Sequence, residues 1–145
     1  MIEITGNIFE QLDADAICFT SNGILDKNGC LVMGAGIAKE FKKMFPLLPE
    51  KIGSLLRLHG NHVIHTTYDS FNICSFPTKI HWKGPSEMWL IKRSAQELSE
   101  QTDENGWNKI YLPRPGVGMG GLNWEDVKKV IDPILDDRFY VINKE

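Results

Sequence analysis

The stretch that decides the fold is LPRPGVGMGGLNWEDV, residues 112–127. Four glycines fall within the six residues from Gly116 to Gly121, more than a simple turn requires. The run follows a strand-like segment and leads to Asn123, a favoured N-cap residue, and an acidic first helical turn. It predicts a strand, a glycine-rich loop and a helix in succession, and such a loop can turn its backbone N–H groups toward a phosphate.

A second glycine-rich segment occupies residues 22–37, between the strand-like Ala16–Thr20 and a helical pattern. Gly34 and Gly36 lack a Cβ and tolerate positive φ, so consecutive N–H groups can converge on a ligand. Glycine content alone fits a flexible crossover equally well, because glycine is also the usual turn residue. If both loops close the carboxyl ends of strands and open helices, they form a cleft suited to a diphosphate.

Short β-branched or aromatic segments predict about six strands, and amphipathic segments between them predict four helices. The strands are Ile2–Thr5, Ala16–Thr20, Val63–Thr67, Phe71–Phe76, Lys109–Leu112 and Phe139–Ile142. The helices are Ile37–Phe45, Pro49–Leu58, Ser86–Glu100 and Glu125–Leu135. Ser86 is expected to start the third helix. The alternation predicts an α/β fold whose parallel or mixed sheet is covered on both faces.

Length and composition favour one globular domain over residues 1–145. Hydrophobic residues make up 42% and charged residues 24% of the chain. A formal net charge of −3 argues against a general nucleic-acid binding surface, which needs a cationic field. The sequence contains neither a membrane-spanning apolar run nor a signal-peptide pattern, so we expect a cytoplasmic protein without a membrane partner.

Cysteines and histidines point to no metal site and no disulfide framework. The three cysteines are widely spaced and include no Cys-x-x-Cys pair. Cys18 and Cys74 lie in strand-like segments, where a cysteine packs as a small hydrophobe. His59, His62 and His65 recur every third residue, a spacing that fits no single strand face. We predict neither a metal nor a cofactor.

Two common nucleotide-binding motifs do not explain the loops. Gly116, Gly118 and Gly121 fit G-x-G-x-x-G, but the stretch after them is too short to complete the fold that this fingerprint serves. This argues against a hydride-transfer enzyme. No G-x-x-x-x-G-K-[ST] run occurs, which argues against a nucleoside triphosphatase.

Three segments together resemble the macrodomain family, and especially its DarG-like ADP-ribosyl glycohydrolase branch. Residues 32–43, VMGAGIAKEFKK, preceded by Asn22, resemble the first glycine motif of the family. Residues 112–127 resemble its diphosphate loop, and residues 76–82, FPTKIHW, resemble a segment whose lysine is catalytic in that branch. The segments follow the family's order, and the resemblance implies a three-layer α/β/α fold around a central mixed sheet.

The resemblance also implies where a ligand binds. Adenine is expected near Asn7 and Ile8, the distal ribose under the first loop, and the diphosphate between the two loops. Asn7 stands where many macrodomains carry an aspartate. The implied ligand-binding residues are Asn7, Ile8, Val32, Met33, Gly34, Ala35, Gly36, Ile37, Pro113, Gly116, Val117, Gly118, Met119, Gly120, Gly121 and Leu122.

The same resemblance assigns catalysis to Lys79 and Asn22. Cleaving an ADP-ribosyl link leaves negative charge on the leaving group, which a lysine can protonate or stabilise, while an asparagine amide orients a ribose hydroxyl. Without the resemblance, Lys79 would be read as a solvated strand-end lysine. Two departures stand out: Phe19 replaces a family asparagine, and Gly120 stands where related glutamyl-ester hydrolases carry a catalytic aspartate. Trp82 is the tryptophan expected nearest the cleft.

The leading interpretation is a hydrolase that removes ADP-ribose from modified DNA or protein. One alternative is an ADP-ribose 1''-phosphate phosphatase, which would need the same cleft. Another is a non-catalytic reader of ADP-ribose or of an NAD-derived nucleotide. The sequence leaves open whether the cleft is catalytic or only binds.

Overall fold

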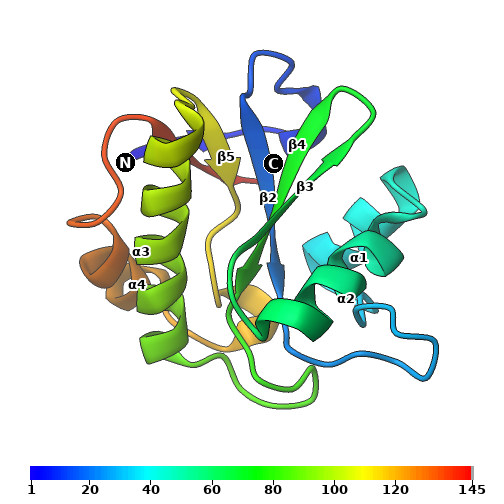
Figure 1. Cartoon of the computed structure of the whole chain (residues 1–145). Helices are drawn as coiled ribbons and strands as arrows, with labels where there is room; N and C mark the ends of the chain where they lie inside the picture. The colour runs from blue at the N-terminus through cyan, green and yellow to red at the C-terminus, as the bar shows by residue number, and fades with distance from the viewer. Residues whose placement is uncertain (145) are drawn as a thin grey trace.

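A mixed six-stranded sheet forms the centre of the molecule, which a computed structural model describes over residues 1–144 (Figure 1). The strand order is β1-β6-β5-β2-β4-β3. Every adjacent pair is parallel except β3 and β4, which form an antiparallel hairpin. The strands are β1 (Ile2–Thr5), β2 (Ala16–Ser21), β3 (Ile64–Tyr68), β4 (Phe71–Pro77), β5 (Ile110–Leu112) and β6 (Phe139–Asn143).

Four α-helices cover the sheet on both faces, which confirms the predicted three-layer α/β/α fold. One face carries α3 and α4 and the other carries α1 and α2 (Figure 1). Each face has its own buried hydrophobic cluster. Ile91, Leu98 and Val127 belong to the cluster on the first face. Phe41 and Ile52 belong to the cluster on the second face. The helices are α1 (Gly36–Met44), α2 (Leu48–His59), α3 (Met88–Asn105) and α4 (Trp124–Ile131), with 3₁₀ helices at Ile8–Glu10 and Gly118–Gly120.

The strand bounds agree with the sequence prediction to within one residue at each end, but the start of the third helix was predicted wrongly. Glu87 is the N-cap of α3, with an extended backbone at φ −112° and ψ 122°, and the helix begins at Met88. Ser86 instead lies buried beside Gly120. The predicted cap of α4 is confirmed, because the side chain of Asn123 accepts hydrogen bonds from the first backbone N–H groups of that helix.

Two cysteines lie side by side in the sheet. Cys18 on β2 is in register with Cys74 on β4, and both side chains are fully buried. The neighbouring Cys74 thiol and burial raise the pKa of the Cys18 thiol well above its usual value. The prediction that these cysteines pack as small hydrophobes is confirmed.

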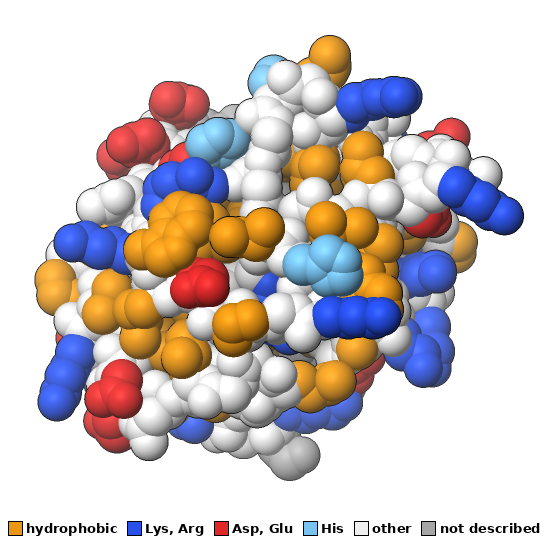
Figure 2. Space-filling view, turned by 90° about the horizontal axis from the view of Figure 1, so that it is seen from below, with side chains coloured by type: hydrophobic (Ala, Val, Ile, Leu, Met, Phe, Trp, Pro, Cys, Tyr) orange, Lys and Arg blue, Asp and Glu red, His pale blue; other side chains and the backbone are white. Residues whose placement is uncertain are grey.

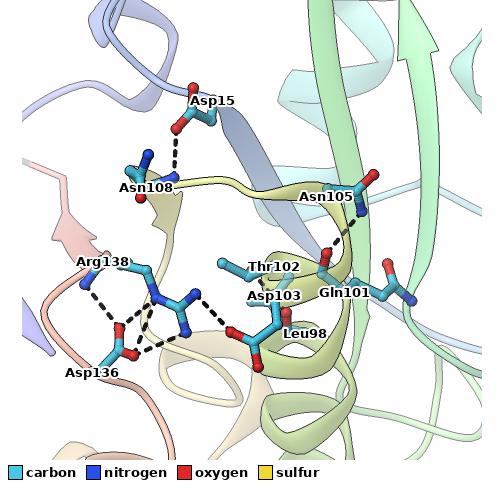
Figure 3. A network of polar contacts seen from close by, with 9 residues as sticks. All are labelled: Asp15, Leu98, Gln101, Thr102, Asp103, Asn105, Asn108, Asp136 and Arg138. Atoms are coloured by element: carbon cyan, nitrogen blue, oxygen red, sulfur yellow. Dashed lines mark hydrogen bonds and ion pairs between the residues drawn. The ribbon is translucent and has the colours of Figure 1, made fainter.

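A polar network fixes the end of the sheet at which β5 and β6 begin (Figure 3). Arg138, just before β6, pairs with Asp136 at 2.9 Å and with Asp103, near the end of α3, at 2.7 Å. Asp15, just before β2, accepts a hydrogen bond from the backbone N of Asn108 at 2.6 Å. These contacts hold the amino ends of the strands and leave the carboxyl ends to the loops.

Both glycine-rich loops leave the sheet at its carboxyl end, as predicted. The first loop follows β2 and the second follows β5, and these two strands are parallel neighbours. On the other side of β2, strand β4 ends at Pro77, two residues before Lys79. The three segments that follow β2, β4 and β5 therefore meet at the carboxyl ends of these neighbouring parallel strands. No helix among residues 1–144 combines the length and apolar character needed to cross a membrane.

Candidate active site

An elongated cleft lies between the two glycine-rich loops. It consists of an inner hollow of about 510 Å³, which reaches Asn22 and Lys79, and an outer hollow of about 620 Å³, which reaches Asn7. The two hollows share Ile37, Pro113, Arg114 and Val117. Figure 2 views the molecule from below Figure 1, where these loops lie, and shows hydrophobic side chains gathered across the face with histidine and Lys or Arg side chains beside them. Two adjoining hollows that share lining residues suit an extended ligand.

Asn22 holds the first loop in shape at the start of the cleft. Its amide Nδ2 donates to the backbone O of Val32 at 3.0 Å, and its Oδ1 accepts from the backbone N of Ile24 at 2.9 Å. The residue is 9% exposed and lines the inner hollow. Each end of the amide keeps one further hydrogen-bonding position, so Asn22 can bind a ligand while it fastens the loop.

Helix α2 supports the first loop from behind. The backbone N of Leu31 donates to the backbone O of Pro49 at 2.9 Å. Gly53 packs directly on the loop, because a Cβ at this position would lie within 3.0 Å of the backbone O of Gly29. At its end the loop reaches Gly36, whose φ of 58° favours glycine, and α1 begins there. The N–H groups of the first turn of α1 therefore face the cleft.

The second glycine-rich loop folds into a compact turn between Gly116 and Leu122. The backbone N of Leu122 donates to the backbone O of Gly116 at 2.9 Å, which closes the loop around the 3₁₀ helix Gly118–Gly120. Gly116 has a φ of 75°, and a Cβ there would lie 2.6 Å from the side chain of Ile91 on α3. The backbone is thus pressed against α3, and no other residue type fits at this position.

Lys79 brings a cation to the inner hollow. Its backbone N donates to the backbone O of Ser21 at 3.3 Å, beside the bond from Thr78 N to the same oxygen at 2.9 Å. These bonds extend the pairing of β2 and β4 to the edge of the cleft. The side chain is half-buried and forms no ion pair with any residue of the described range 1–144. The ammonium therefore has no acidic side chain competing with a ligand.

Two buried hydroxyl groups beside Lys79 have no hydrogen-bond partner within residues 1–144. They belong to Ser21 and Ser86, which are 7% and 6% exposed, and both residues line the inner hollow. A buried hydroxyl without a partner costs about 1–3 kcal/mol. Polar atoms placed in the inner hollow by a ligand would meet this unused hydrogen-bonding capacity.

Trp82 lies at the rim of the inner hollow with 45% of its surface exposed. His81 stacks on it with ring centroids 5.3 Å apart, and the Nζ of Lys83 lies 4.9 Å from its ring centroid. The backbone N of Gly84 donates to the backbone O of His81 at 2.9 Å, which closes the turn. A large aromatic side chain is therefore held at the cleft in a basic surrounding.

Arg114 lines both hollows and is held from outside the cleft. Its guanidinium lies 4.9 Å from the ring centroid of Trp124 and 3.8 Å from the carboxylate of Glu3. Glu3 also accepts from Trp124 Nε1 at 2.9 Å and pairs with Lys128 at 2.6 Å. The hydrogen bonds from Lys128 and Trp124 lower the pKa of the Glu3 carboxyl. Arg114 is thus a fixed cation between the two hollows.

The structure brings most of the predicted site residues to the cleft. In the inner hollow or shared by both lie Asn22, Val32, Gly34, Ala35, Gly36, Ile37, Lys79, Pro113, Gly116, Val117, Met119 and Gly120. The outer hollow adds Asn7, Ile8 and Gly118. Met33 lies instead in the core at 2% exposure, and neither Gly121 nor Leu122 lines a hollow. Phe19 is fully buried against Phe41, so it takes no part in the cleft.

Other residues at the cleft were missed from the sequence. Thr78 and Arg114 lie within the motif segments and could have been included on that ground. Ser21 is the last residue of β2, and its position at a strand's carboxyl end was the available signal. Ser86 carried no such signal, because it was predicted to start a helix.

A family model described as Macro domain matches residues 27–131. The DNA ADP-ribosyl glycohydrolase of Thermus aquaticus is 32% identical over 144 residues, which cover 92% of this chain and 37% of that protein. The corresponding protein of Mycobacterium tuberculosis is 33% identical over 109 residues, covering 68% of this chain and 30% of that protein. The chain thus spans about a third of the length of these curated relatives.

A solved structure supports the same similarity over nearly the whole chain. The macrodomain of Mycobacterium tuberculosis DarG superposes with a TM-score of 0.81 at 29% sequence identity, covering 96% of this chain and 95% of that one. The likeness therefore extends over nearly the whole of both chains.

Proposed function

Since the chain belongs to the Macro domain family, we propose that it binds ADP-ribose in the cleft and hydrolyses the bond that joins ADP-ribose to a modified DNA. The single observation that carries the hydrolase assignment is Lys79, a cation without an acidic partner in the described chain, at the inner hollow beside both glycine-rich loops. The name of the relatives, DNA ADP-ribosyl glycohydrolase, supports the choice of reaction and substrate.

In this proposal the ligand lies along the cleft. The diphosphate binds between the loops, where the first turn of α1 and the glycine backbone from Gly116 to Gly120 offer N–H donors, and Arg114 adds a fixed positive charge. The adenine occupies the outer hollow beside Asn7 and Ile8. The distal ribose then reaches the inner hollow with Asn22 and Lys79.

The reaction replaces the bond at the anomeric carbon of the distal ribose. A water oxygen adds to that carbon, the bond to the leaving group breaks, and the leaving group takes a proton from the ammonium of Lys79. The proton released by the water restores the charge of the lysine. The unpaired hydroxyls of Ser21 and Ser86 give the inner hollow further groups that can orient the water or the ribose.

Trp82 supports DNA over protein as the carrier of the modification. An exposed indole at the rim, with Lys83 beside it, offers a stacking surface to a base next to the modified nucleotide. The net charge of −3 fits this arrangement, because binding would rest on the ligand and one local platform rather than on a broad cationic surface.

The test compares wild type with Lys79→Ala on three substrates: single-stranded DNA carrying ADP-ribose on a base, ADP-ribosylated protein, and ADP-ribose 1''-phosphate. Mass spectrometry should show release of ADP-ribose from the DNA by wild type, and at least about 100-fold slower release by Lys79→Ala. Calorimetry should show that both proteins bind free ADP-ribose. Lys92→Ala, an exposed lysine on α3 away from the cleft, is the matched control.

Each other outcome points to a different function. Phosphate release from ADP-ribose 1''-phosphate without cleavage of the DNA would indicate a phosphatase. Binding of ADP-ribose with no turnover of any substrate would indicate a reader. Full turnover by Lys79→Ala would remove Lys79 from the mechanism.

A further inference from the structure

We propose that Asn61, which lies outside the cleft, is the positioning residue that fixes Lys79 for the reaction. The inference rests on the proposed function in one respect, namely that Lys79 is the catalytic lysine. Asn61 follows Gly60, the C-cap of α2, and lines neither hollow. It therefore acts through the backbone of Lys79 and not on the ligand.

The first contact joins Asn61 to the backbone of Lys79. Its amide Nδ2 donates to the backbone O of Lys79 at 3.1 Å. On the other side of the Lys79 α-carbon, the backbone N of Lys79 donates to the backbone O of Ser21 at 3.3 Å. Because β4 ends at Pro77, the carbonyl of Lys79 lies beyond the regular strand pairing, and Asn61 supplies its donor. The peptide unit that carries the Lys79 side chain is thus held on both sides.

The second contact joins Asn61 to the first glycine-rich loop. A Cβ on Gly23 would lie 2.9 Å from both Cγ and Nδ2 of Asn61, so the loop backbone rests directly on this amide. The backbone N of Gly23 also donates to the backbone O of Ile80 at 3.1 Å. One side chain therefore lies between the loop that carries Asn22 and the segment that carries Lys79, and it sets the spacing of the two.

Asn61 is itself anchored to α3. The guanidinium of Arg93 donates to the backbone O of Asn61. Arg93 pairs with Glu97 one turn further along the helix, at 3.7 Å, and Glu97 accepts from the backbone N of Val63 at 3.0 Å. The backbone of Asn61 and that of Val63 are thus fixed to a long helix, which limits the movement of the Asn61 side chain with the loop.

This geometry predicts a specific kinetic effect. If the hydrogen bond to the Lys79 carbonyl is lost, that peptide can rotate and move the ammonium, while the loops that bind ADP-ribose keep their own hydrogen bonds. A misplacement of about 1 Å can cost about 100-fold in rate. The turnover number should fall while the affinity for ADP-ribose stays.

The experiment uses two variants that disturb the same contact from opposite sides. Asn61→Leu keeps the approximate size but removes the donor, and Gly23→Ala pushes on the amide from the loop. Each should lower kcat on ADP-ribosylated DNA by about 10- to 100-fold, with the Kd for ADP-ribose within about two-fold of wild type. The double variant should be little worse than either single variant, because both act on one contact. Asn105→Leu, an exposed asparagine at the far end of α3, is the matched control.

Two results would overturn the proposal. One is wild-type kcat in Asn61→Leu while Lys79→Ala is inactive. The other is a parallel loss of kcat, ADP-ribose affinity and thermal stability in Asn61→Leu, which would indicate a general structural role. Failure of the proposed function is distinguishable, because wild type then releases no ADP-ribose from the DNA, or Lys79→Ala keeps full activity, whatever the result for Asn61→Leu.

Discussion

The hydroxyl oxygen of Ser86 lies against the α-carbon of Gly120, so close that a Cβ on Gly120 would come within 3.0 Å of it. The backbone N of Ser86 also donates to the backbone O of Gly120 at 3.4 Å, so a main-chain hydrogen bond and close packing join the two residues. The second loop thus reaches its position only because residue 120 has no side chain. An aspartate at this position would need Ser86 to move first.

The pairing of these residues predicts a steric compensation. Gly120→Ala should weaken ADP-ribose binding by about ten-fold or more, because overpacking of a close contact costs about 1–3 kcal/mol and the loop must shift. Ser86→Ala removes the hydroxyl that meets the new Cβ, so the double variant should recover most of the affinity. Calorimetry with ADP-ribose measures both. Wild-type affinity in Gly120→Ala alone would show that the contact is not tight.

Local patterns in the sequence were sufficient for the fold. Short β-branched or aromatic segments bounded by Gly, Pro, Asn or Asp predicted all six strands, and the inner strands β2, β4 and β5 bury most of their side chains. The ends of the helices were predicted less accurately than those of the strands. The sequence predicts that α4 reaches Leu135, but the helix ends at Ile131 and one further turn follows, in which the backbone N of Leu135 donates to the backbone O of Ile131 before the chain enters β6. Such an end depends on where the next strand begins, which no local pattern records.

The site was predictable where it consists of contiguous motifs and not where it depends on distant segments. The glycine-rich loops and Lys79 lie in short runs with a clear composition. Asn61 contacts Lys79 across 18 positions of sequence, and its neighbours Gly60 and His62 suggest only a turn. Met33 shows the reverse case, because it lies inside the first motif while its side chain packs in the core, so that only its backbone is left for a ligand.

Asn22 should prove necessary for loop structure as well as for ligand binding. Asn22→Leu leaves the backbone O of Val32 and the backbone N of Ile24 without partners at a nearly buried site. Each unsatisfied group costs about 1–3 kcal/mol, so Tm should fall by several degrees and ADP-ribose affinity should fall with it. Thermal unfolding with and without ADP-ribose separates the two effects. An unchanged Tm would mean that the first loop does not depend on the two hydrogen bonds of Asn22.

Gly53 offers a test in which two effects oppose each other. Alanine is favoured over glycine within a helix by about 1 kcal/mol, so Gly53→Ala would normally stabilise α2. Here the new Cβ would meet the backbone O of Gly29, which cannot move without shifting the first loop. We expect a net loss of about 1–3 kcal/mol and weaker ADP-ribose binding. Ser54→Ala, on the exposed side of the same helix, should leave both unchanged within about 0.5 kcal/mol.

The cluster around Glu3 predicts a pH dependence of stability. Because the hydrogen bonds from Lys128 and Trp124 lower the pKa of this carboxyl below its usual value of 4.5, ionised Glu3 stabilises the folded chain. The contribution is complete above the unfolded pKa and is lost as the pH falls through the folded pKa. Glu3→Gln should therefore unfold at a lower temperature than wild type at pH 7, and the gap should close toward pH 3. Tm measured from pH 3 to pH 7 gives the comparison, and a gap independent of pH would contradict it.

Trp82 separates recognition of the DNA from recognition of ADP-ribose. Its indole is 45% exposed at the rim of the inner hollow, whereas the loops and Arg114 line the remainder of the cleft. Stacking of a base on an aromatic side chain contributes about 1–3 kcal/mol, so Trp82→Ala should weaken binding of ADP-ribosylated single-stranded DNA by about 10- to 100-fold and leave free ADP-ribose unaffected. Trp82→Phe should retain most of the binding, because a phenyl ring still offers a stacking face. Trp89→Ala, at a tryptophan on α3 that is 52% exposed but lies outside both hollows, should bind both ligands as wild type does. An equal loss for DNA and for free ADP-ribose would mean that Trp82 supports the cleft itself, and the substrate would then have to be recognised elsewhere.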